Sequence, residues 1–355
     1  MQLRALFLHR ETTLPILGVF EMSQKSTQVV LKKRPTDNHI EACFKFESKQ
    51  LQDLENGEIR VANHFISIDP YIRLRLNNAK SYMPPQALNS VIESASAGVI
   101  VASRHSEFNL GDEVVGQGNW QSFYQGKPDG FRRVNTQNIP LTAYLGPLGM
   151  TGITAWVGVM KIIKPLTGEQ IIVNAASGAV GSVAGQICKS LGARVIGVAG
   201  GKEKCCYVTN TLGFDACLDY KAAGFEKSLD DALAGNGIDG LFENVGGKQL
   251  DLFMERMNPH ARVALCGLIS GSYDSNPLPI ANANHFLTSR FSMKGFIVSD
   301  YLSDWPEALR DIAKIIANGG IVWRETIDEG LANAPNAFIN MLNGKNIGKQ
   351  LIKIK

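Results

Sequence analysis

The stretch Gln170-Ile-Ile-Val-Asn-Ala-Ala-Ser-Gly-Ala-Val-Gly-Ser-Val-Ala-Gly-Gln-Ile-Cys-Lys189 decides the fold class of this chain. It opens on an apolar run at 171–173, which predicts a buried parallel strand. A small-x-x-Gly-x-x-Gly turn follows, formed by Ala175, Gly178 and Gly181. Beyond the turn, apolar residues recur at helical spacing, at Val183, Ile187 and Leu191, which predicts a helix. A tight turn that leads into a helix N-terminus suits the pyrophosphate of a dinucleotide, so we predict a dinucleotide-binding βα unit here.

The strand after this helix indicates which dinucleotide is bound. Residues 194–199 predict that strand, which ends at Gly200 and Gly201. An NAD site usually places Asp or Glu at this point, roughly 20 residues after the glycine turn, to accept from the ribose hydroxyls. This chain has no carboxylate at the strand end, and Lys202 and Lys204 lie just beyond it. Cations favour a 2′-phosphate, so we predict NADP(H); the alternative is that both lysines are merely solvated at a helix start.

The composition excludes several classes of partner. The chain has 355 residues, 45% of them hydrophobic and 19% charged, which is enough for about two domains with substantial cores. Its 36 basic and 33 acidic residues leave a net charge of +3, without a long basic run. We therefore expect neither nucleic acid nor a membrane surface as partner. No apolar stretch reaches the ~20 residues of a membrane span.

Cysteine usage indicates a reducing compartment. None of the six cysteines has Cys-x-x-Cys spacing with another, and most lie in apolar strand or helix patterns. We expect no disulfide framework and a cytoplasmic location. The N-terminal apolar stretch at 14–20 is interrupted by Pro15 and Gly18, which is atypical of a signal peptide. Residues 1–21 are interpreted as a loose tail or a mis-set start.

Periodicity divides the chain into four parts. After an N-terminal tail at 1–26, residues 27–143 form short β-type runs with Gly or Pro between them. Residues 144–316 alternate strand and helix patterns, which predicts a doubly wound parallel sheet. Residues 317–355 return to a strand, at 321–327, and a helix that could pair with the first region. We predict an α/β fold with a parallel-sheet domain and a separate β-rich domain.

Seven motifs in one order carry a family resemblance that covers nearly the whole chain after Met22. They are Asp69–Arg73, Gly149–Ala155, Ala175–Gly181, Glu243–Gly247, Cys266–Ser270, Gly295–Val298 and Gly344–Lys349. The chain resembles the zinc-free medium-chain dehydrogenase/reductases. Within them it is most similar to the branch of prostaglandin reductases (leukotriene B4 12-hydroxydehydrogenases), plant alkenal double-bond reductases and bacterial curcumin reductases. The resemblance implies a GroES-like catalytic domain completed by the C-terminal segment, a Rossmann NADP-binding domain, and a cleft at their junction; we also expect a homodimer.

The sequence argues against a bound metal. Zinc-dependent relatives carry Gly-His-Glu before a Gly-Val run, and this chain has Glu93-Ser94-Ala95 at that place. Cysteine is absent from residues 44–187, so neither a catalytic nor a four-cysteine structural zinc site can be assembled there. Hydrogen-bond donors must then polarise the substrate carbonyl. Hydride addition to an activated C=C bond, where the developing charge is an enolate, is therefore favoured over an alcohol/aldehyde reaction.

The resemblance implies a role for particular residues in cofactor binding. The loop Gly178, Ala179, Val180 and Gly181 should hold the pyrophosphate. Lys204 and Tyr220 should contact the 2′-phosphate, Asn244 the nicotinamide ribose, and Asn346 the cofactor from the tail. The expected neighbours of the nicotinamide are Cys266, Gly267, Leu268, Ile269, Ser270, Gly271, Ser272, Phe296, Ile297 and Val298. Many relatives have Ser where this chain has Gly201, so one hydrogen bond to the 2′-phosphate is expected to be missing.

A tyrosine hydroxyl is the expected catalytic group. Animal relatives have Tyr at the position of Ser299, so we assign the role to Tyr71, with Tyr301 second. The alternative for Tyr71 is a half-buried packing residue. The histidines His64, in a strand-like run, His260, in a turn, and His285 are interpreted as structural. An aromatic group is equally consistent with a pocket wall or with core packing; it comprises Trp120, Phe123 and Tyr124.

These features predict an NADPH-dependent reductase of the C=C bond of α,β-unsaturated aldehydes and ketones. The alternative within the superfamily is an NADPH:quinone oxidoreductase, which would use the same cofactor. An alternative of another class is a non-catalytic NADPH-binding protein, which would bind the cofactor without turnover.

Overall fold

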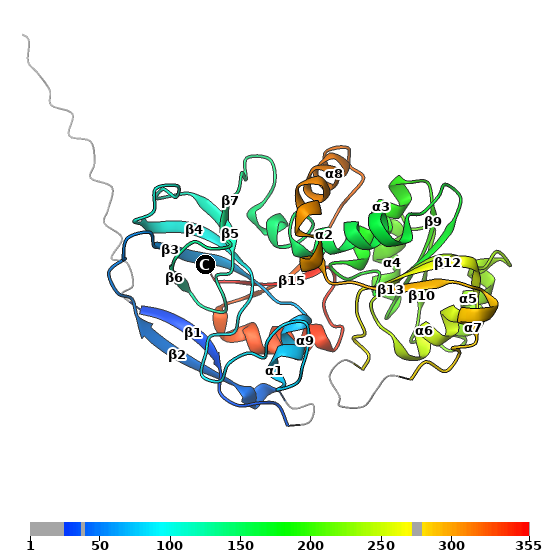
Figure 1. Cartoon of the computed structure of the whole chain (residues 1–355), viewed down its shortest axis with the longest axis horizontal. Coiled ribbons are helices and arrows are strands. Elements are labelled where there is room, and N and C mark those ends of the chain that lie inside the picture. The colour runs from blue at the N-terminus through cyan, green and yellow to red at the C-terminus, as the bar shows by residue number, and fades with distance from the viewer. Residues whose placement is uncertain (1–24, 37–39, 272–278, 355) are drawn as a thin grey trace, which may run out of the picture.

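The computed structural model describes residues 25–36, 40–271 and 279–354 as two lobes (Figure 1). One lobe is built on a parallel sheet flanked by helices, and the other is rich in antiparallel strands. The predicted fold class is therefore confirmed. Residues 1–24 of the tail predicted at 1–26, and the cofactor candidate Ser272, lie outside the described residues. Lys25 and Ser26 were wrongly predicted as tail, because they begin the first strand, β1 (Lys25–Leu31). The exact domain limits near 143 and 316 stay a prediction.

The α/β lobe contains a 6-stranded sheet in the order β10-β9-β8-β11-β12-β13, and each of its pairings is parallel. The strands are β8 (Gln170–Asn174), β9 (Arg194–Ala199), β10 (Ala216–Asp219), β11 (Ile238–Glu243), β12 (Met257–Leu265) and β13 (Ser292–Gly295). Successive side chains of a strand point to opposite faces. Ile171 and Val173 accordingly belong to one hydrophobic core and Ile172 to another, so both faces of β8 are covered.

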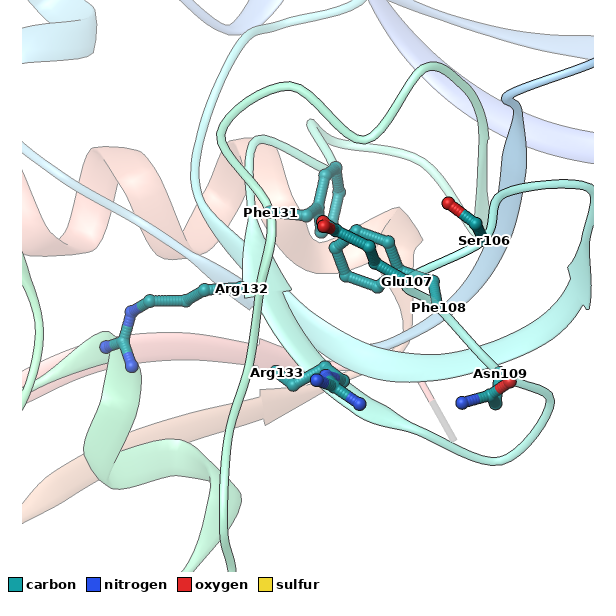
Figure 2. Close-up of a pocket in the computed structure, with 7 residues that line it drawn as sticks. All are labelled: Ser106, Glu107, Phe108, Asn109, Phe131, Arg132 and Arg133. Atoms are coloured by element: carbon teal, nitrogen blue, oxygen red, sulfur yellow. The ribbon is translucent and has the colours of Figure 1, made fainter.

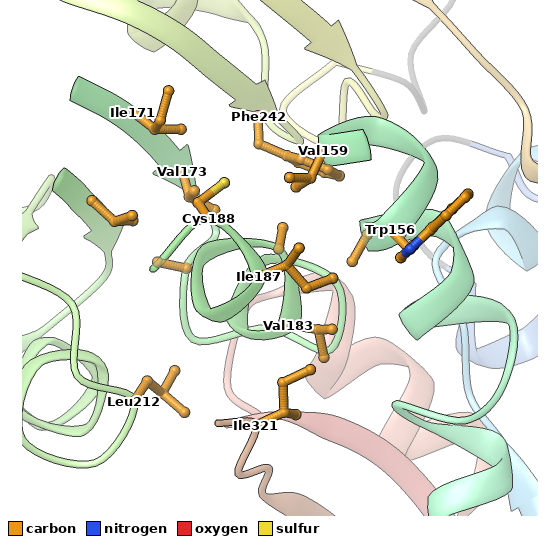
Figure 3. Close-up of a cluster of buried hydrophobic side chains, with 14 of the residues drawn as sticks. Trp156, Val159, Ile171, Val173, Val183, Ile187, Cys188, Leu212, Phe242 and Ile321 are labelled. Carbon is orange, nitrogen blue, oxygen red and sulfur yellow. The ribbon is translucent and has the colours of Figure 1, made fainter. Parts of the chain in front are cut away.

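Helices cover both faces of this sheet. They are α2 (Met150–Val157), the π-helical η3 (Gly158–Ile163), α3 (Gly181–Ser190), α4 (Lys202–Asn210), α5 (Phe225–Leu233), α6 (Gly247–Met254), α7 (His285–Thr288) and α8 (Trp305–Ala317). In the core of α2, α3 and α8, Val183 and Ile187 are buried, as their helical spacing predicts (Figure 3). Ile321 from the C-terminal segment is buried in the same core. Among the described helices, none has both the length and the hydropathy that crossing a membrane requires.

The β-rich lobe contains a 7-stranded sheet in the order β14-β15-β3-β4-β5-β7, with β6 also paired to β3, and a separate β1-β2 pair. Its elements are β1 (Lys25–Leu31), β2 (Phe44–Gln50), β3 (Ile59–Ser67), α1 (Tyr71–Leu76), β4 (Ser96–Ser103), β5 (Glu113–Gly116), β6 (Phe123–Gly126), β7 (Arg132–Arg133), β14 (Glu325–Glu329), α9 (Ala334–Leu342) and β15 (Lys349–Lys353). The last strand, β15, runs antiparallel to β3, so the red end of the chain lies among the blue and cyan elements of this lobe (Figure 1).

The first strand of the C-terminal segment, β14, begins later than predicted. We expected a strand at 321–327, and β14 instead covers Glu325–Glu329. The residues before it are engaged elsewhere, because the side chain of Gln186 on α3 pairs with the backbone of Val322. Gln186 Nε2 donates to the Val322 carbonyl and Gln186 Oε1 accepts from the Val322 N–H, both at 2.9 Å. This buried amide joins the tail to the α/β lobe instead of to the sheet.

Two interpretations from the sequence are settled by packing. Trp120 is fully buried between Phe44 and Phe338, with ring centroids at 5.7 and 5.8 Å, and Tyr124 packs on Phe131 at 4.8 Å. The aromatic group therefore packs the β-rich lobe. The turn predicted for His260 was wrong: this residue lies inside β12, although at a φ of 67°. Its N–H donates to the Ser289 carbonyl at 2.9 Å, which holds it in the strand.

Candidate active site

The glycine turn after β8 has the geometry of a phosphate-binding loop. Ala175 takes a φ of 46°, its carbonyl accepts from the Gly178 N–H at 2.9 Å, and α3 begins at Gly181. A Cβ on Gly181 would lie 2.5 Å from the Ala175 carbonyl oxygen, so only glycine allows the helix to pack this closely. Ala179 and Val180 lie between these points. The first turn of a helix leaves backbone N–H groups for an anion, as a pyrophosphate requires.

The C-terminal segment lies against this loop. The N–H of Gly348 donates to the Ser177 carbonyl at 2.7 Å, and Gly178 and Gly348 form a parallel β-bridge. Asn346 lies two residues before Gly348 in this tail turn, and its contact with the cofactor stays a prediction. Its side-chain amide donates to the Gly348 carbonyl at 2.9 Å and so shapes the tail turn in this structure.

Lys204 and Tyr220 lie at the end of β9. Gly201, at a φ of 96°, caps the start of α4, and Lys204 lies in the first turn of that helix. A Cβ on Gly200 would lie 2.9 Å from the Tyr220 ring, so the two sequence candidates flank the glycine pair. Gly201 takes a φ of 96°, at which a serine would be strained in this chain. Burial is the main cause of a lowered pKa at Lys204.

Asn244 is held in place by the neighbouring strand. Its N–H donates to Asn174 Oδ1 at 2.6 Å and its Nδ2 donates to the Asn174 carbonyl at 2.9 Å. The segment Cys266–Gly271 is bound to the same turn, since the Cys266 and Gly267 N–H groups both donate to the Glu243 carbonyl, at 2.8 and 3.1 Å. The Ile269 N–H donates to the Asn244 carbonyl at 3.2 Å. Two of the predicted cofactor segments therefore form one unit.

Glu243 is a site residue that the sequence analysis missed. Its Oε1 accepts from Asn174 Nδ2 at 2.5 Å and from the backbone N–H groups of Val245 and Gly246 at 2.6 and 2.7 Å. Its Oε2 is buried and has no hydrogen-bond partner. Burial is the main cause of a raised pKa at this carboxyl. The sequence did contain a signal for it, because a charged residue ends a strand that is otherwise largely apolar.

Phe296 and Tyr301 pack at the rim of the α/β core. The Phe296 ring lies 6.4 Å, centroid to centroid, from both Phe242 and Tyr301. Val298 begins the 3-10 helix η4 (Val298–Asp304), and its carbonyl accepts from Trp305 Nε1 at 3.3 Å. The second tyrosine candidate, Tyr301, is partly buried against this core. Its ring therefore has a packing role in the structure.

Tyr71 is the first residue of α1, in the β-rich lobe. A pair of buried groups fixes this helix start: Lys349 Nζ lies 2.8 Å from Asp69 Oδ1 and donates to the Ile68 carbonyl at 2.8 Å. The Asp69 carboxylate also accepts from the Ser67 hydroxyl. Burial raises the pKa of the Tyr71 hydroxyl, and the charge of Asp69 raises it further. The hydroxyl therefore stays protonated and can donate a hydrogen bond at neutral pH.

Tyr82 joins this group from the loop that follows α1, and the sequence analysis missed it as well. Half of its side chain is exposed. Its pKa is raised first by burial, then by Cys266 of the other lobe and by Asp69. A residue that interacts electrostatically with both Cys266 and Asp69 lies where the two lobes face each other. A lone aromatic residue in a polar, proline-containing loop was the only signal in the sequence.

Comparison with known proteins assigns the family. Residues 27–134 match the family described as the N-terminal domain of oxidoreductase, and residues 179–314 match that described as zinc-binding dehydrogenase. The NADPH-dependent curcumin reductase of Escherichia coli (strain K12) is 36% identical over 94% of this chain and 98% of its own length. The NADP(+)-dependent 2-alkenal reductase of Nicotiana tabacum is 34% identical, also over 94% of this chain and 98% of its own length. The chain belongs to the zinc-free branch of the medium-chain dehydrogenase/reductase family.

A solved structure from this family extends the likeness to three dimensions. The crystal structure of CurA in complex with NADPH, from Vibrio vulnificus, is 38% identical in sequence and superimposes with a TM-score of 0.88. The match covers 93% of this chain and 99% of that chain. It therefore includes both lobes and the segments that face each other between them.

The position where zinc-dependent members of the family carry a histidine is occupied by a packed serine. Ser94 is fully buried, and its hydroxyl donates to the Ala95 carbonyl at 3.3 Å. In the part of the chain that the structure describes, no three His, Cys, Asp or Glu side chains gather as a metal site would require. The six cysteines are free thiols.

A hollow of about 480 Å³ lies elsewhere in the β-rich lobe (Figure 2). Residues 106–109 and 131–133 line it, and none of the candidate site residues is among them. Phe108 and Phe131 lie side by side there, whereas Arg132 and Arg133 point in different directions. Arg132 instead donates to the Leu148 carbonyl at 3.1 Å and lies over the Tyr144 ring. The hollow is thus separate from the candidate active site.

Proposed function

We propose that this NADP-dependent oxidoreductase reduces the C=C bond of α,β-unsaturated aldehydes and ketones with NADPH. The observation that carries the proposal is Tyr71, a partly buried hydroxyl at the start of α1 whose raised pKa keeps it protonated. The names of the curcumin and 2-alkenal reductases among its relatives support the same chemistry.

The described residues fit the proposed cofactor. The loop Gly178–Gly181 would receive the pyrophosphate, Lys204 and Tyr220 the 2′-phosphate, and Asn244 the nicotinamide ribose. When bound, NADPH supplies the hydride for the β-carbon of the substrate. The tail turn at Gly348, joined to Ser177, would hold the phosphate loop in position for it.

Tyr71 would stabilise the charge that develops on the substrate oxygen. Hydride addition to the β-carbon creates an enolate, and a neutral hydroxyl can donate to that oxygen. A tyrosine with a raised pKa is suited to this role because it remains a donor throughout the physiological range. Solvent would then supply the proton to the α-carbon. Tyr82, which interacts electrostatically with Asp69 as Tyr71 does, is the candidate for a second donor.

A substrate panel tests the proposal. NADPH oxidation would be followed with short alkenals, bulky aryl enones and quinones. We expect the highest kcat/KM with an alkenal or enone. A preference for quinones would favour the quinone oxidoreductase alternative, and NADPH binding without turnover on any of the three classes would indicate a non-catalytic protein.

We further propose that the protein is a cytoplasmic homodimer with domains at 27–143 and 317–355 and at 144–316. The six free cysteines support a reducing compartment. Light scattering of the purified full chain measures the oligomeric state directly. A monomeric mass at micromolar concentration would contradict the dimer.

A further inference from the structure

We propose that Lys221 is a second cation of the 2′-phosphate site and that it sets much of the preference for NADPH over NADH. The inference rests on the cofactor given under the proposed function. The sequence analysis named Lys202 and Lys204 as the cations near the 2′-phosphate, with Lys204 and Tyr220 as its expected contacts, and did not include Lys221.

The position of Lys221 follows from the packing around Gly200. A Cβ on Gly200 would meet the Lys221 side chain at Cε, at 3.0 Å, and the Tyr220 hydroxyl, also at 3.0 Å. Both side chains therefore cross the same glycine at the end of β9. Lys221 Nζ also lies 5.8 Å from the centroid of the Tyr220 ring. The ammonium and the phenol thus lie beside the same point at which the adenosine ribose of a dinucleotide is expected.

The two lysines of this corner differ in how they are held. Lys204 Nζ donates to the Gly344 carbonyl of the tail at 2.6 Å, which restrains it. Lys221 is exposed, and no carboxylate of the described residues forms an ion pair with either ammonium. The nearby Asp219 is turned to the backbone: its Oδ1 accepts from the N–H groups of Gly201 and Lys221 at 2.8 and 3.0 Å. That carboxylate therefore fixes the turn that carries Lys221 and leaves its ammonium unpaired.

Two cations that lack a carboxylate partner at the same strand end indicate a dianionic ligand. After burial, the charge of Lys221 is the largest cause of the lowered pKa at Lys204, so the two ammoniums repel each other in the free protein. A phosphate monoester carries about two negative charges at neutral pH and would relieve that repulsion. A ribose hydroxyl in NADH would not. The repulsion between the two lysines therefore destabilises the free protein, and only a ligand with a 2′-phosphate relieves it. This gives a preference for NADPH over NADH.

The test compares Lys221→Gln with Lys227→Gln, a loss of the same charge at an exposed position on α5. Calorimetry on the full chain would give the Kd for NADPH, NADH, 2′,5′-ADP and 5′-AMP. We expect Lys221→Gln to weaken NADPH and 2′,5′-ADP by roughly five- to twentyfold and to leave NADH and 5′-AMP unchanged. Lys221→Arg should retain most of the affinity for NADPH. The NADPH Kd of Lys221→Gln should also depend less on salt than that of Lys227→Gln.

The outcomes separate this inference from the function on which it rests. If the wild-type chain prefers NADPH but Lys221→Gln and Lys227→Gln bind it equally well, Lys221 has no role in the site and the inference is wrong. If Lys221→Gln weakens NADH as much as NADPH, the residue acts on the fold of the turn, which also overturns it. A wild-type chain without preference for NADPH would refute the cofactor assignment itself.

Discussion

Lys349 and Asp69 form a buried ion pair at 2.8 Å although 280 positions separate them in the chain. Lys349 is in β15 at the C-terminus, and Asp69 lies two residues before Tyr71. Both side chains are almost fully buried. The C-terminal segment thus determines where the helix that carries the candidate catalytic hydroxyl begins.

Replacing Lys349 by Met should damage both stability and catalysis. Removing one partner leaves the Asp69 carboxylate buried and unpaired, which costs roughly 3–5 kcal/mol of unfolding free energy. The kcat on an enone should fall while the Kd for NADPH changes little. Lys353→Met is the control, because Lys353 pairs only at 3.6 Å with the exposed Glu329. Equal urea midpoints for the two variants would contradict the role of the buried pair.

Tyr71→Phe should lower kcat on an enone by roughly 10- to 1000-fold, the range for loss of one oxyanion donor. The value of kcat/KM should fall in parallel, since the interaction exists only in the transition state. The Kd for NADPH should hardly change. An unchanged kcat would transfer the role to Tyr82 or Tyr301, and a lower Tm with normal kcat would support the packing interpretation.

The pH dependence of the wild-type enzyme should show no loss of the Tyr71 donor in the physiological range. Burial and Asp69 raise the pKa of Tyr71 above its ordinary value, so the hydroxyl keeps its proton from about pH 7 to at least about pH 9. We expect kcat on an enone to be flat over this interval. Because its pKa is raised in the folded state, the Tyr71 hydroxyl contributes to the free energy of unfolding below the unfolded pKa of ~10. This contribution is lost as the pH rises above that value. A basic limb below about pH 9 that disappears in Tyr71→Phe would contradict the raised pKa of this hydroxyl, although it would still identify Tyr71 as the donor.

NADPH should be preferred over NADH by about tenfold or more in kcat/KM, which is ~1.4 kcal/mol. Lys204→Ala should narrow this ratio, mainly through the KM for NADPH, because it removes a charge-assisted contact. Steady-state rates with both cofactors measure the effect. Equal kcat/KM values for the two cofactors in the wild type would contradict the prediction.

Activity should survive exhaustive chelation. Ser94 occupies the position of the metal-binding histidine, and residues 44–187 contain no cysteine. Prolonged dialysis against a strong chelator, followed by metal analysis and assay of the same sample, is the measurement. Stoichiometric zinc that is lost together with turnover would show the prediction to be wrong.

Glu243→Gln should be at least as stable as the wild type at neutral pH. Burial raises the pKa of Glu243, so its contribution to stability is present below the unfolded pKa of ~4.3 and is lost as the pH rises above it. A neutral amide avoids burying that charge and can still accept from the N–H groups of Val245 and Gly246. Glu243→Ala leaves those donors unsatisfied and should cost roughly 1–3 kcal/mol. Thermal melts at neutral and acidic pH compare the three proteins; a large loss of stability in Glu243→Gln at neutral pH would show that the charge itself is needed.

Much of the α/β lobe was predictable because its signals are local. The glycine turn after β8, the apolar spacing of Val183 and Ile187, and the lack of a carboxylate at Gly200 all concern residues close in sequence. Hydrogen bonds and side-chain periodicity over a few residues produce these features, so the sequence by itself determined the fold class and the family resemblance.

Only the tertiary structure decided the rest, since it depends on residues far apart in the chain. Trp120 was equally consistent with a pocket wall until Phe44 and Phe338 were seen to enclose it. The strand expected at 321–327 is displaced because Gln186 binds Val322. The Asp69–Lys349 pair, the unpartnered Glu243 oxygen and the approach of Lys221 to Gly200 likewise arise from long-range packing. No local pattern encodes such contacts, because each requires two segments to meet in one place with a particular burial and charge.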